Sequence, residues 1–402
     1  MDFDKIINRE NTHSVNYQGW PDRLLVSKKG QQLKSQIDLK EYIRMWVADM
    51  DLATPRFILD AIKGRLDREI LGYSEPDDRY LEVLSAWFWE HYKWRINTKE
   101  LVFSPGVVFA LYRLVALTVQ EGESILFNTP SYGPFYQAAR VNRVNAYFSP
   151  LLKENGQFNL DFKDIKEQLD DSHKRIKMFI FCNPHNPTGR VWTESELWEI
   201  GEICIKRDIW LISDEIHCDL LREGKTFIPL ARLFKGEQRI ITCTSPSKTF
   251  NIAGMQLSHI FIADPKLRER WNELYKDGLA PLSIVAAQAA YQSGAEWLKK
   301  LNRYLDGSFQ ELQKLLAELL PDAKFHIPDA SYVAWIDLNA YTHKIGEEYH
   351  SLAEFLAINA KVVVNGQEAF VANAQGYIRL NIACPRSVMI EGVRRIAQAL
   401  NG

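Results

Sequence analysis

Short apolar segments alternate with amphipathic helical segments through the middle of the chain. The apolar segments end in polar or turn-forming residues and cover residues 124–128, 176–182, 210–213 and 239–244. Between two of them, Thr193–Glu196 has a capping-box pattern that predicts the start of a helix. Strands that alternate with helices in this way favour a mainly parallel sheet covered by helices on both faces. We therefore expect the α/β fold class.

The last third of the chain has a different pattern. Helical spacing of apolar residues covers 281–293, 296–320 and 388–400, and strand-like segments cover 332–338, 362–364 and 377–382. Strands clustered with helices in this way indicate a separate, smaller α+β domain. We expect residues 1–50 to form an N-terminal arm and part of the small domain, 51–285 the large domain, and 286–402 the C-terminal small domain.

Charge and hydropathy argue against two classes of partner. Among the 402 residues, 49 Lys and Arg nearly balance 51 Asp and Glu, which leaves a formal net charge of −2. Because there is no basic excess, we expect no nucleic-acid partner. Every apolar run is far shorter than the roughly 18 residues of a membrane-spanning helix, and the charged N-terminus does not resemble a signal peptide. We therefore expect no membrane partner.

The cysteines indicate a reducing environment. There are five, an odd number, with no Cys-x-x-Cys pair and no regular spacing. This favours reduced thiols in a cytoplasmic protein over a disulfide framework or a zinc site, and we expect no metal. Cys182, Cys218 and Cys243 lie near strand ends, where they are better interpreted as buried small residues than as nucleophiles.

Polar and ionisable residues follow the ends of the expected strands. They lie in segments 104–106, 129–132, 183–189, 214–217 and 245–248. In open α/β sheets, ligands bind beyond the carboxyl ends of the strands. Taken singly, Asp214 is most simply a helix cap and Lys248 a solvated surface group. Their joint occurrence at strand ends favours a shared site, because either group would be costly to bury alone.

These residues suit one cofactor well, pyridoxal phosphate (PLP). PLP needs a lysine amine for its Schiff base and a carboxylate opposite its pyridine nitrogen. Its phosphate needs backbone N–H groups at a helix N-terminus, and Gly106 precedes an expected helix. Rival motifs are absent from the sequence: there is no G-x-G-x-x-G after a strand, no phosphate-binding loop and no G-x-S-x-G.

At this point the sequence resembles a known family. Segment 245–254 is similar to the Schiff-base segment of the PLP-dependent class I/II aminotransferase superfamily, also called fold type I. Segments 45–51, 214–220 and 379–386 resemble the cystathionine β-lyase or C–S lyase branch of that superfamily. The resemblance runs from about residue 3 to the C-terminus. It implies a large domain that binds PLP on a mainly parallel sheet, together with a smaller α+β domain.

The resemblance also implies an activity. A C–S β-lyase would cleave cystathionine or a cysteine S-conjugate by α,β-elimination to a thiol, pyruvate and ammonia. An aminotransferase acting on an amino acid and a 2-oxo acid is the alternative, because both reactions use the same cofactor residues. A third hypothesis is a regulatory protein that uses the fold to bind a protein partner.

The resemblance implies roles at the cofactor ring for four residues and leaves two alternatives for a fifth, His217. Lys248 would form the Schiff base and then move the substrate Cα proton. Asp214 would pair with the pyridine nitrogen, and Asn186 would donate to the ring oxygen. Tyr132, which is counted with Lys248 and Asp214 as catalytic, would stack on the ring. His217 would either contact the ring oxygen or simply fill core space.

The resemblance assigns a second set of residues to the cofactor phosphate and to the substrate. The residues implied for the phosphate are Gly106, Val107, Val108, Ser245, Ser247 and Tyr73. Tyr73 matches a tyrosine that reaches the phosphate of the neighbouring subunit, which implies a homodimer with shared active sites. Ser245 and Ser247 could instead be loop caps, and the two tyrosines plain packing. Arg379 would hold the carboxylate of an amino-acid substrate in a bidentate fork, with Asn186 and Ala48 beside it.

Some positions depart from the family pattern. Gln256 stands where many relatives carry an arginine, and Asn16 stands where the branch usually has lysine. Residues 329–332, 365–366 and 370–376 also differ from the usual motifs. Most of these differences are expected on the substrate side, so they leave the substrate open while the cofactor assignment stands.

Overall fold

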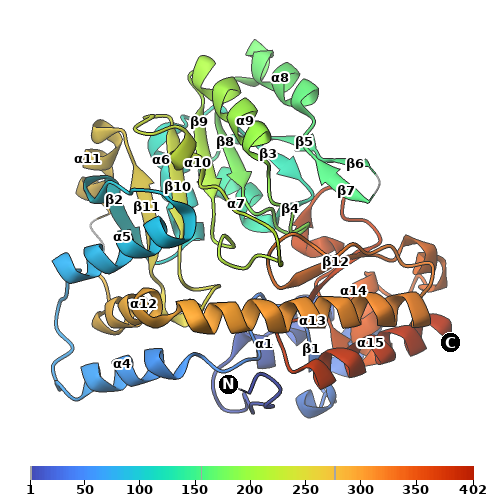
Figure 1. Cartoon of the computed structure of the whole chain (residues 1–402). Helices are drawn as coiled ribbons and strands as arrows, with labels where there is room; N and C mark the ends of the chain where they lie inside the picture. Colours follow the sequence, from blue (N-terminus) through green and yellow to red (C-terminus); the bar gives the residue numbers. More distant parts are fainter. Residues whose placement is uncertain (1, 155, 276–277) are drawn as a thin grey trace.

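A seven-stranded sheet forms the centre of the molecule (Figure 1). The computed structural model describes residues 2–154, 156–275 and 278–402. The strand order is β2-β11-β10-β9-β8-β3-β5. Only β11 runs antiparallel to its neighbours, and the other pairs of this sheet are parallel. The strands are β2 (Leu101–Ser104), β3 (Ser124–Thr129), β5 (Asn145–Pro150), β8 (Ile176–Cys182), β9 (Trp210–Asp214), β10 (Ile240–Thr244) and β11 (Ser258–Ile262).

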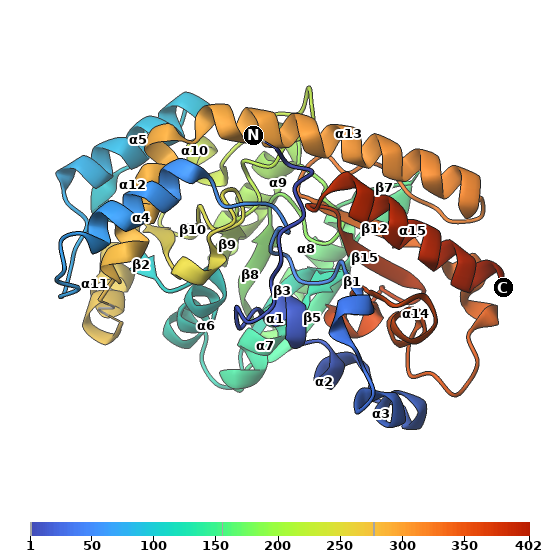
Figure 2. The same cartoon turned by 90° about the horizontal axis from the view of Figure 1, so that it is seen from below.

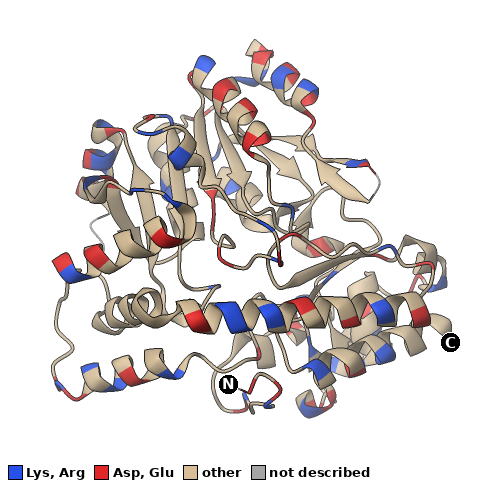
Figure 3. Ribbon diagram, in the orientation of Figure 1, with Lys and Arg blue, Asp and Glu red and all other residues tan. Residues whose placement is uncertain are grey.

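Helices cover both faces of this sheet, which confirms the expected α/β class. On β3, Ile125 and Phe127 pack into one apolar cluster, whereas Leu126 packs into another on the opposite face. The first cluster includes residues of α6 (Val107–Thr118), α7 (Gly133–Val141) and α11 (Pro265–Leu274). The second includes residues of α8 (Phe162–Asp170), α9 (Glu194–Lys206) and α10 (Leu230–Leu233). Charged residues gather on the helices and loops, while the central strands are drawn mostly in tan (Figure 3).

Local sequence signals place several of these elements correctly. Strand β8 has the bounds that the apolar run predicts, and α9 begins at the predicted capping box. There the Thr193 hydroxyl accepts from the Glu196 amide, while the Glu196 carboxylate accepts from the Thr193 amide at 2.6 Å. Strand β11 is antiparallel because loop 245–257 contains only a short 3₁₀ turn and no crossover helix.

The remaining elements surround the sheet or form small sheets of their own. Antiparallel pairs join β12 (Val333–Asp337) to β15 (Tyr377–Asn381), β4 (Ser131–Tyr132) to β14 (Phe370–Val371) and β6 (Leu152–Glu154) to β7 (Gln157–Asn159), and β1 (Ile43–Arg44) is parallel to β13 (Val362–Val363). The other helices are α1 (Val15–Gln18), α2 (Pro21–Leu24), α3 (Lys28–Lys34), α4 (Arg56–Leu66), α5 (Asp78–Tyr92), α12 (Pro281–Ser293), α13 (Ala295–Leu319), α14 (Leu352–Ala360) and α15 (Arg386–Asn401).

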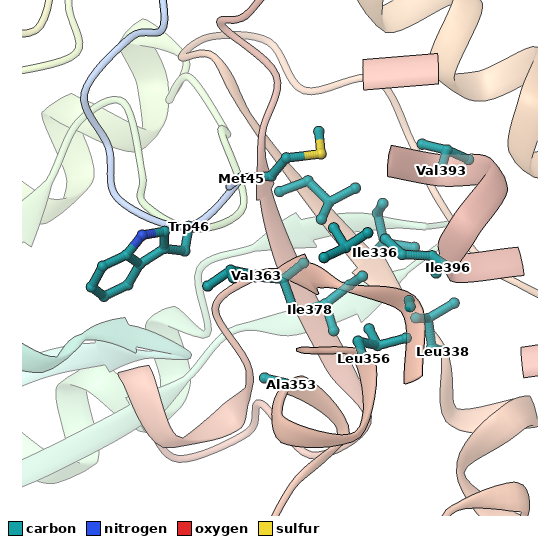
Figure 4. Packing of buried hydrophobic residues seen from close by; sticks show 14 of the residues in the cluster. Met45, Trp46, Ile336, Leu338, Ala353, Leu356, Val363, Ile378, Val393 and Ile396 are labelled. Carbon is teal, nitrogen blue, oxygen red and sulfur yellow. The ribbon is translucent and has the colours of Figure 1, made fainter. Parts of the chain in front are cut away.

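The N-terminal segment shares a core with the C-terminal part of the chain. One apolar cluster is drawn from residues 20–46 and 309–400. Met45 and Trp46 point to opposite sides, and Met45 faces Val393 and its neighbours (Figure 4). At Gly392 a Cβ atom would lie 2.8 Å from the Met45 sulfur, so a larger residue there would require the Met45 side chain to shift. This shared core is compatible with the expected three-part division, which stays a prediction.

Helix α13 connects two apolar clusters (Figures 1 and 2). Near its start, Leu301 and Leu305 pack in the cluster that also contains residues of α4, α5 and α12. Nearer its end, Phe309 and Leu312 pack in the cluster shared with β12, β15 and α15. One rigid helix therefore fixes how the two cores lie relative to each other.

Replacing Leu312 with alanine should lower the free energy of unfolding by about 2–5 kcal/mol, because this fully buried side chain would leave a cavity. Urea denaturation followed by circular dichroism measures the change. Lys314→Ala, at an exposed position of the same helix, should change stability by no more than about 0.5 kcal/mol. Equal effects of the two substitutions would contradict the assignment of Leu312 to the core.

Candidate active site

A cavity of about 480 Å³ collects most of the residues singled out from the sequence. It lies beyond the carboxyl ends of β9 and β10, next to the start of α6. Its lining includes Ala48, Gly106, Val107, Val108, Tyr132, Asn186, Asp214, His217, Ser245, Ser247, Lys248 and Arg379. A larger cavity of about 600 Å³, between β6–β7 and residues 323–329, contains none of them. The smaller cavity is therefore the candidate active site.

Lys248 is partly buried in the loop that follows β10. Its Nζ donates a 2.6 Å hydrogen bond to the carbonyl oxygen of Ala48, and the Tyr332 hydroxyl donates to the same oxygen at 2.9 Å. Burial, which is the larger cause, and the positive charge of Arg379 together lower the pKa of Lys248 to about 8, against the opposing effects of Asp49 and Asp214. The amine is therefore much easier to deprotonate than an ordinary lysine.

Asp214 ends β9 inside the cavity. Its Oδ1 accepts from the Ile216 amide at 3.2 Å. Burial raises the pKa of Asp214 to about 7, although that amide and Lys248 both favour the carboxylate. Its register neighbours are Cys182 on β8 and Cys243 on β10. Burial raises the pKa of both thiols, which suits packing residues better than nucleophiles.

Arg379 on β15 is a buried cation in the same cavity. Its Nη1 donates to Asn186 Oδ1 at 3.0 Å, and its Nη2 donates to Asn365 Oδ1 at 2.7 Å and to the Trp46 carbonyl at 3.2 Å. Its Nε is buried without a partner. No carboxylate within residues 2–154, 156–275 and 278–402 forms an ion pair with this guanidinium. An anionic ligand would therefore relieve the cost of burying it.

His217 and Tyr132 complete the wall around Asp214 and Arg379. His217 Nδ1 lies 3.2 Å from the Ser331 hydroxyl, and burial lowers its pKa to about 3, so the ring is neutral near pH 7. Tyr132 precedes α7 and pairs with Phe370 across β4 and β14. Burial raises the pKa of the Tyr132 hydroxyl. Both rings line the cavity.

The opposite end of the cavity offers backbone donors. Helix α6 begins at Val107 directly after Gly106, and no side chain caps its N-terminus. Its first amides are therefore available to an anion. The Ser245 hydroxyl donates to the Leu257 carbonyl at 2.6 Å and accepts from the Ser247 amide at 3.2 Å, as a loop cap does. Both serines still line the cavity.

Comparison with known proteins identifies the family. Residues 40–396 match the family model described as aminotransferase class I and II. The chain belongs to this family. The resemblance seen in the sequence is thereby confirmed.

Individual relatives of the class I and II aminotransferase family match the whole chain. It is 35% identical to cystathionine beta-lyase PatB of Bacillus subtilis, over 100% of both chains. It is 28% identical to protein MalY of Escherichia coli, over 100% of this chain and 99% of that one. The crystal structure of the PLP-bound C-S lyase from Staphylococcus hominis superposes with a TM-score of 0.93 at 42% identity, covering 100% of this chain and 98% of the other.

PLP, the cofactor of the matched enzymes, fits the residues of this cavity. Lys248 provides a primary amine of lowered pKa, as a Schiff-base lysine requires. Asp214 provides a buried carboxylate that a protonated pyridine nitrogen would stabilise in its charged form. The uncapped start of α6 provides N–H donors for a phosphate. Asn186 uses its carbonyl oxygen on Arg379, which leaves its NH₂ group as the donor.

Tyr73 lies outside the cavity of its own chain. It belongs to the segment between α4 and α5, and its side chain is fully exposed. The role implied for it belongs to the site of a neighbouring subunit, so the structure of one chain leaves that role a prediction.

Two asparagines without a role in the sequence-based predictions bind the backbone of segment 47–52, which contains the cavity-lining residue Ala48. Asn251 donates through Nδ2 to the carbonyls of Met50 and Leu52 at 3.0 and 2.8 Å. Asn381 donates to the carbonyls of Val47 and Asp49 at 2.7 and 2.5 Å. Both lie inside segments that carry the resemblance, at 245–254 and 379–386. Asn251 follows Lys248 by three positions and Asn381 follows Arg379 by two. A polar amide so close in sequence to a site residue was the signal that could have identified them.

Arg9 and Asn16, near the N-terminus, contact the acidic residues of segment 49–51, and no pattern in the sequence predicts these contacts. Arg9 binds the Asp49 carboxylate with two hydrogen bonds of 3.2 and 2.7 Å and Asp51 at 2.7 Å. Asn16, one of the departures noted above, donates to Asp49 at 3.1 Å. The negative charge of Asp49 in turn favours the protonated form of Lys248. The arm therefore orients an acidic residue that acts electrostatically on the site.

In the protein freed of cofactor, acylation of Lys248 should reach half its maximal rate near pH 8, since only the neutral amine reacts and burial lowers its pKa to about 8. Mass spectrometry of the peptide labelled by acetic anhydride at each pH measures the rate. Arg379→Gln should move the midpoint to higher pH, because it removes a charge that disfavours the ammonium. A rate that still rises beyond pH 10 in the unaltered protein would contradict this prediction.

Proposed function

We propose that this chain is a PLP-dependent C–S β-lyase that cleaves cystathionine or cysteine S-conjugates to a thiol, pyruvate and ammonia. One observation carries the PLP chemistry, which an aminotransferase would share: Lys248, Asp214 and Arg379 line one cavity. The names of the relatives favour the lyase, since one is a cystathionine beta-lyase and a close structural neighbour is a PLP-bound C-S lyase.

Arg379 would hold the substrate by its α-carboxylate. Contacts with Asn186, Asn365 and the Trp46 carbonyl orient the guanidinium before the substrate arrives. Three of the five guanidinium N–H groups make these contacts, which leaves the Nε–H and one Nη1 N–H to donate to the oxygens of a carboxylate. Binding therefore fixes the direction of the substrate Cα without a large loss of side-chain freedom.

Lys248 would act as the base at the substrate Cα. When bound, PLP withdraws electrons from the substrate Cα and makes its proton easier to remove. A lysine with a pKa near 8 has a useful neutral fraction at physiological pH, which a general base requires. Asp214 would hold a proton on the pyridine nitrogen through an ion pair. Once Lys248 has taken the Cα proton, the electron pair of that bond forms the Cα–Cβ double bond and the thiolate leaves from Cβ.

We also propose a homodimer in which Tyr73 reaches the site of the neighbouring subunit. Ile70, Leu71 and Tyr73 lie in one segment and are 75%, 54% and fully exposed in the single chain. An apolar stretch of this kind is unfavourable in water and typical of a surface that a partner covers. A second copy of this chain fits that surface because Tyr73 is the residue that the family pattern assigns to the shared site.

No helix among the described residues is long and apolar enough to cross a membrane. All five cysteines are buried and unpaired. Reduced thiols suit a cytoplasmic location, which we propose for this enzyme.

The purified protein should show a visible absorbance band of the cofactor bound to lysine and should release pyruvate and thiol from cystathionine. Lys248→Ala should abolish both, because it removes the amine that binds the cofactor and moves the proton. Absorbance and a coupled pyruvate assay measure these outcomes. Conversion of the cofactor to its amine form by amino acids that lack a leaving group, without pyruvate release from cystathionine, would instead identify an aminotransferase.

Mixing the inactive variants Tyr73→Ala and Lys248→Ala should restore activity above that of either alone. In a mixed dimer with shared sites, one site receives an intact Tyr73 from one subunit and an intact Lys248 from the other. Subunits exchanged in mild urea, followed by the pyruvate assay and sedimentation velocity, measure this. A dimer that regains nothing on mixing would show that Tyr73 does not act across the interface.

A further inference from the structure

Asp219 lies in the loop that follows β9, five positions after Asp214, which is the last residue of that strand. Asp214 and His217 line the active-site cavity, whereas Asp219 is not part of its lining. Asp219 is 7% exposed and contacts residues of α5 and α13. Asp214 at the end of β9 therefore faces the cavity, and Asp219 in the loop that follows contacts the helices behind it.

The Asp219 carboxylate accepts hydrogen bonds from three neutral donors. The Tyr92 hydroxyl and the Trp87 indole N–H donate to Oδ1, the indole at 3.3 Å. The Thr249 hydroxyl donates to Oδ2 at 2.7 Å. Asn302 donates to the Asp219 main-chain carbonyl at 3.0 Å, which holds the backbone as well.

Only one donor of this cluster, the Trp87 indole N–H, is unable to accept a hydrogen bond, whereas the Tyr92 and Thr249 hydroxyls can do both. The carboxylate offers acceptor sites on both of its oxygens, and its negative charge strengthens all three hydrogen bonds. No cationic side chain within residues 2–154, 156–275 and 278–402 forms an ion pair with Asp219, so burying it is costly and these three hydrogen bonds must offset that cost.

Thr249 connects this cluster to the lysine. It is the residue next to Lys248 and is fully buried. Two residues further on, Asn251 donates to the carbonyls of Met50 and Leu52, in the segment that follows the cavity-lining residue Ala48. Lys248 is therefore followed by two anchored residues, one bound to Asp219 and one to segment 50–52.

We propose that Asp219 is a positioning residue that fixes Lys248 relative to Asp214 through its hydrogen bond with Thr249. The inference rests on the function proposed for Lys248. Because only four residues separate Asp214 at the end of β9 from Asp219, the backbone directly links the carboxylate that would face the pyridine nitrogen to the carboxylate that holds the lysine loop. A small displacement between a base and its substrate is costly, so this coupling bears on turnover more than on binding.

The test compares Thr249→Val with Thr249→Ser in the cofactor-loaded enzyme. Valine keeps the shape of threonine but cannot donate to Asp219, whereas serine can. Thr249→Val should lower kcat by about tenfold or more with little change in KM, since it displaces the base without touching the carboxylate site. It should also alter the visible circular dichroism of the bound cofactor. Thr249→Ser should restore most of kcat and the spectrum.

Thr242→Val provides the matched control, because it removes another fully buried threonine hydroxyl, one without a hydrogen-bond partner. It should leave kcat and the spectrum unchanged. If Thr249→Val does not fold, as judged by its thermal unfolding, Thr249→Ala carries the same expectation, because it also removes the hydroxyl that donates to Asp219.

Equal kcat and equal spectra for the valine and serine variants of Thr249 would overturn the inference, as would an equal loss in Thr242→Val. If the unaltered enzyme has no visible band and releases no thiol, the proposed function itself fails. Normal activity of the unaltered enzyme together with indistinguishable Thr249 variants refutes only the role of Asp219.

Discussion

The carbonyl oxygen of Ala48 is the contact on which the arrangement of the site depends. It accepts hydrogen bonds from Lys248 in the loop after β10 and from Tyr332 next to β12. Segment 45–52, which carries this oxygen, has no long strand or helix of its own and is held by side chains. Asn251 and Asn381 bind its carbonyls from two directions, and Arg9 binds its carboxylates. Four distant parts of the chain thus converge on one backbone segment.

Burial gives the groups around this segment their reactivity. The same low-polarity surroundings lower the pKa of Lys248 to about 8 and raise that of Asp214 to about 7. Arg379 remains charged but has no carboxylate partner within the part of the chain that the structure describes. The protein alone therefore holds a base, an acid and a cation at a cost in stability. A ligand that carries a pyridine nitrogen, a phosphate and a carboxylate supplies the complementary charges. Its binding therefore offsets part of the stability lost by burying these groups.

Much of the fold could be predicted because its signals are local. The apolar run of β8 and the capping box of α9 each specify an element from adjacent residues. The expected helix over 296–320 forms as α13, since its apolar stripe recurs at helical spacing. Strands β5 and β11 could not be predicted in the same way. Strand β5 is an edge strand with partly exposed residues, and β11 contains His259, so neither forms an uninterrupted apolar run.

The sequence by itself determined the chemistry of the site, because a lysine, an aspartate and an arginine in recognisable segments specify what PLP needs. It also determined the α/β class, since hydrophobic periodicity depends only on neighbouring residues. Only the tertiary structure decided how these residues are held: the pairing of Arg9 with Asp49, of Asn251 with Met50, and of Asp219 with Thr249. Such contacts join residues far apart in sequence, and their geometry follows from packing of the whole chain, for which no local pattern exists.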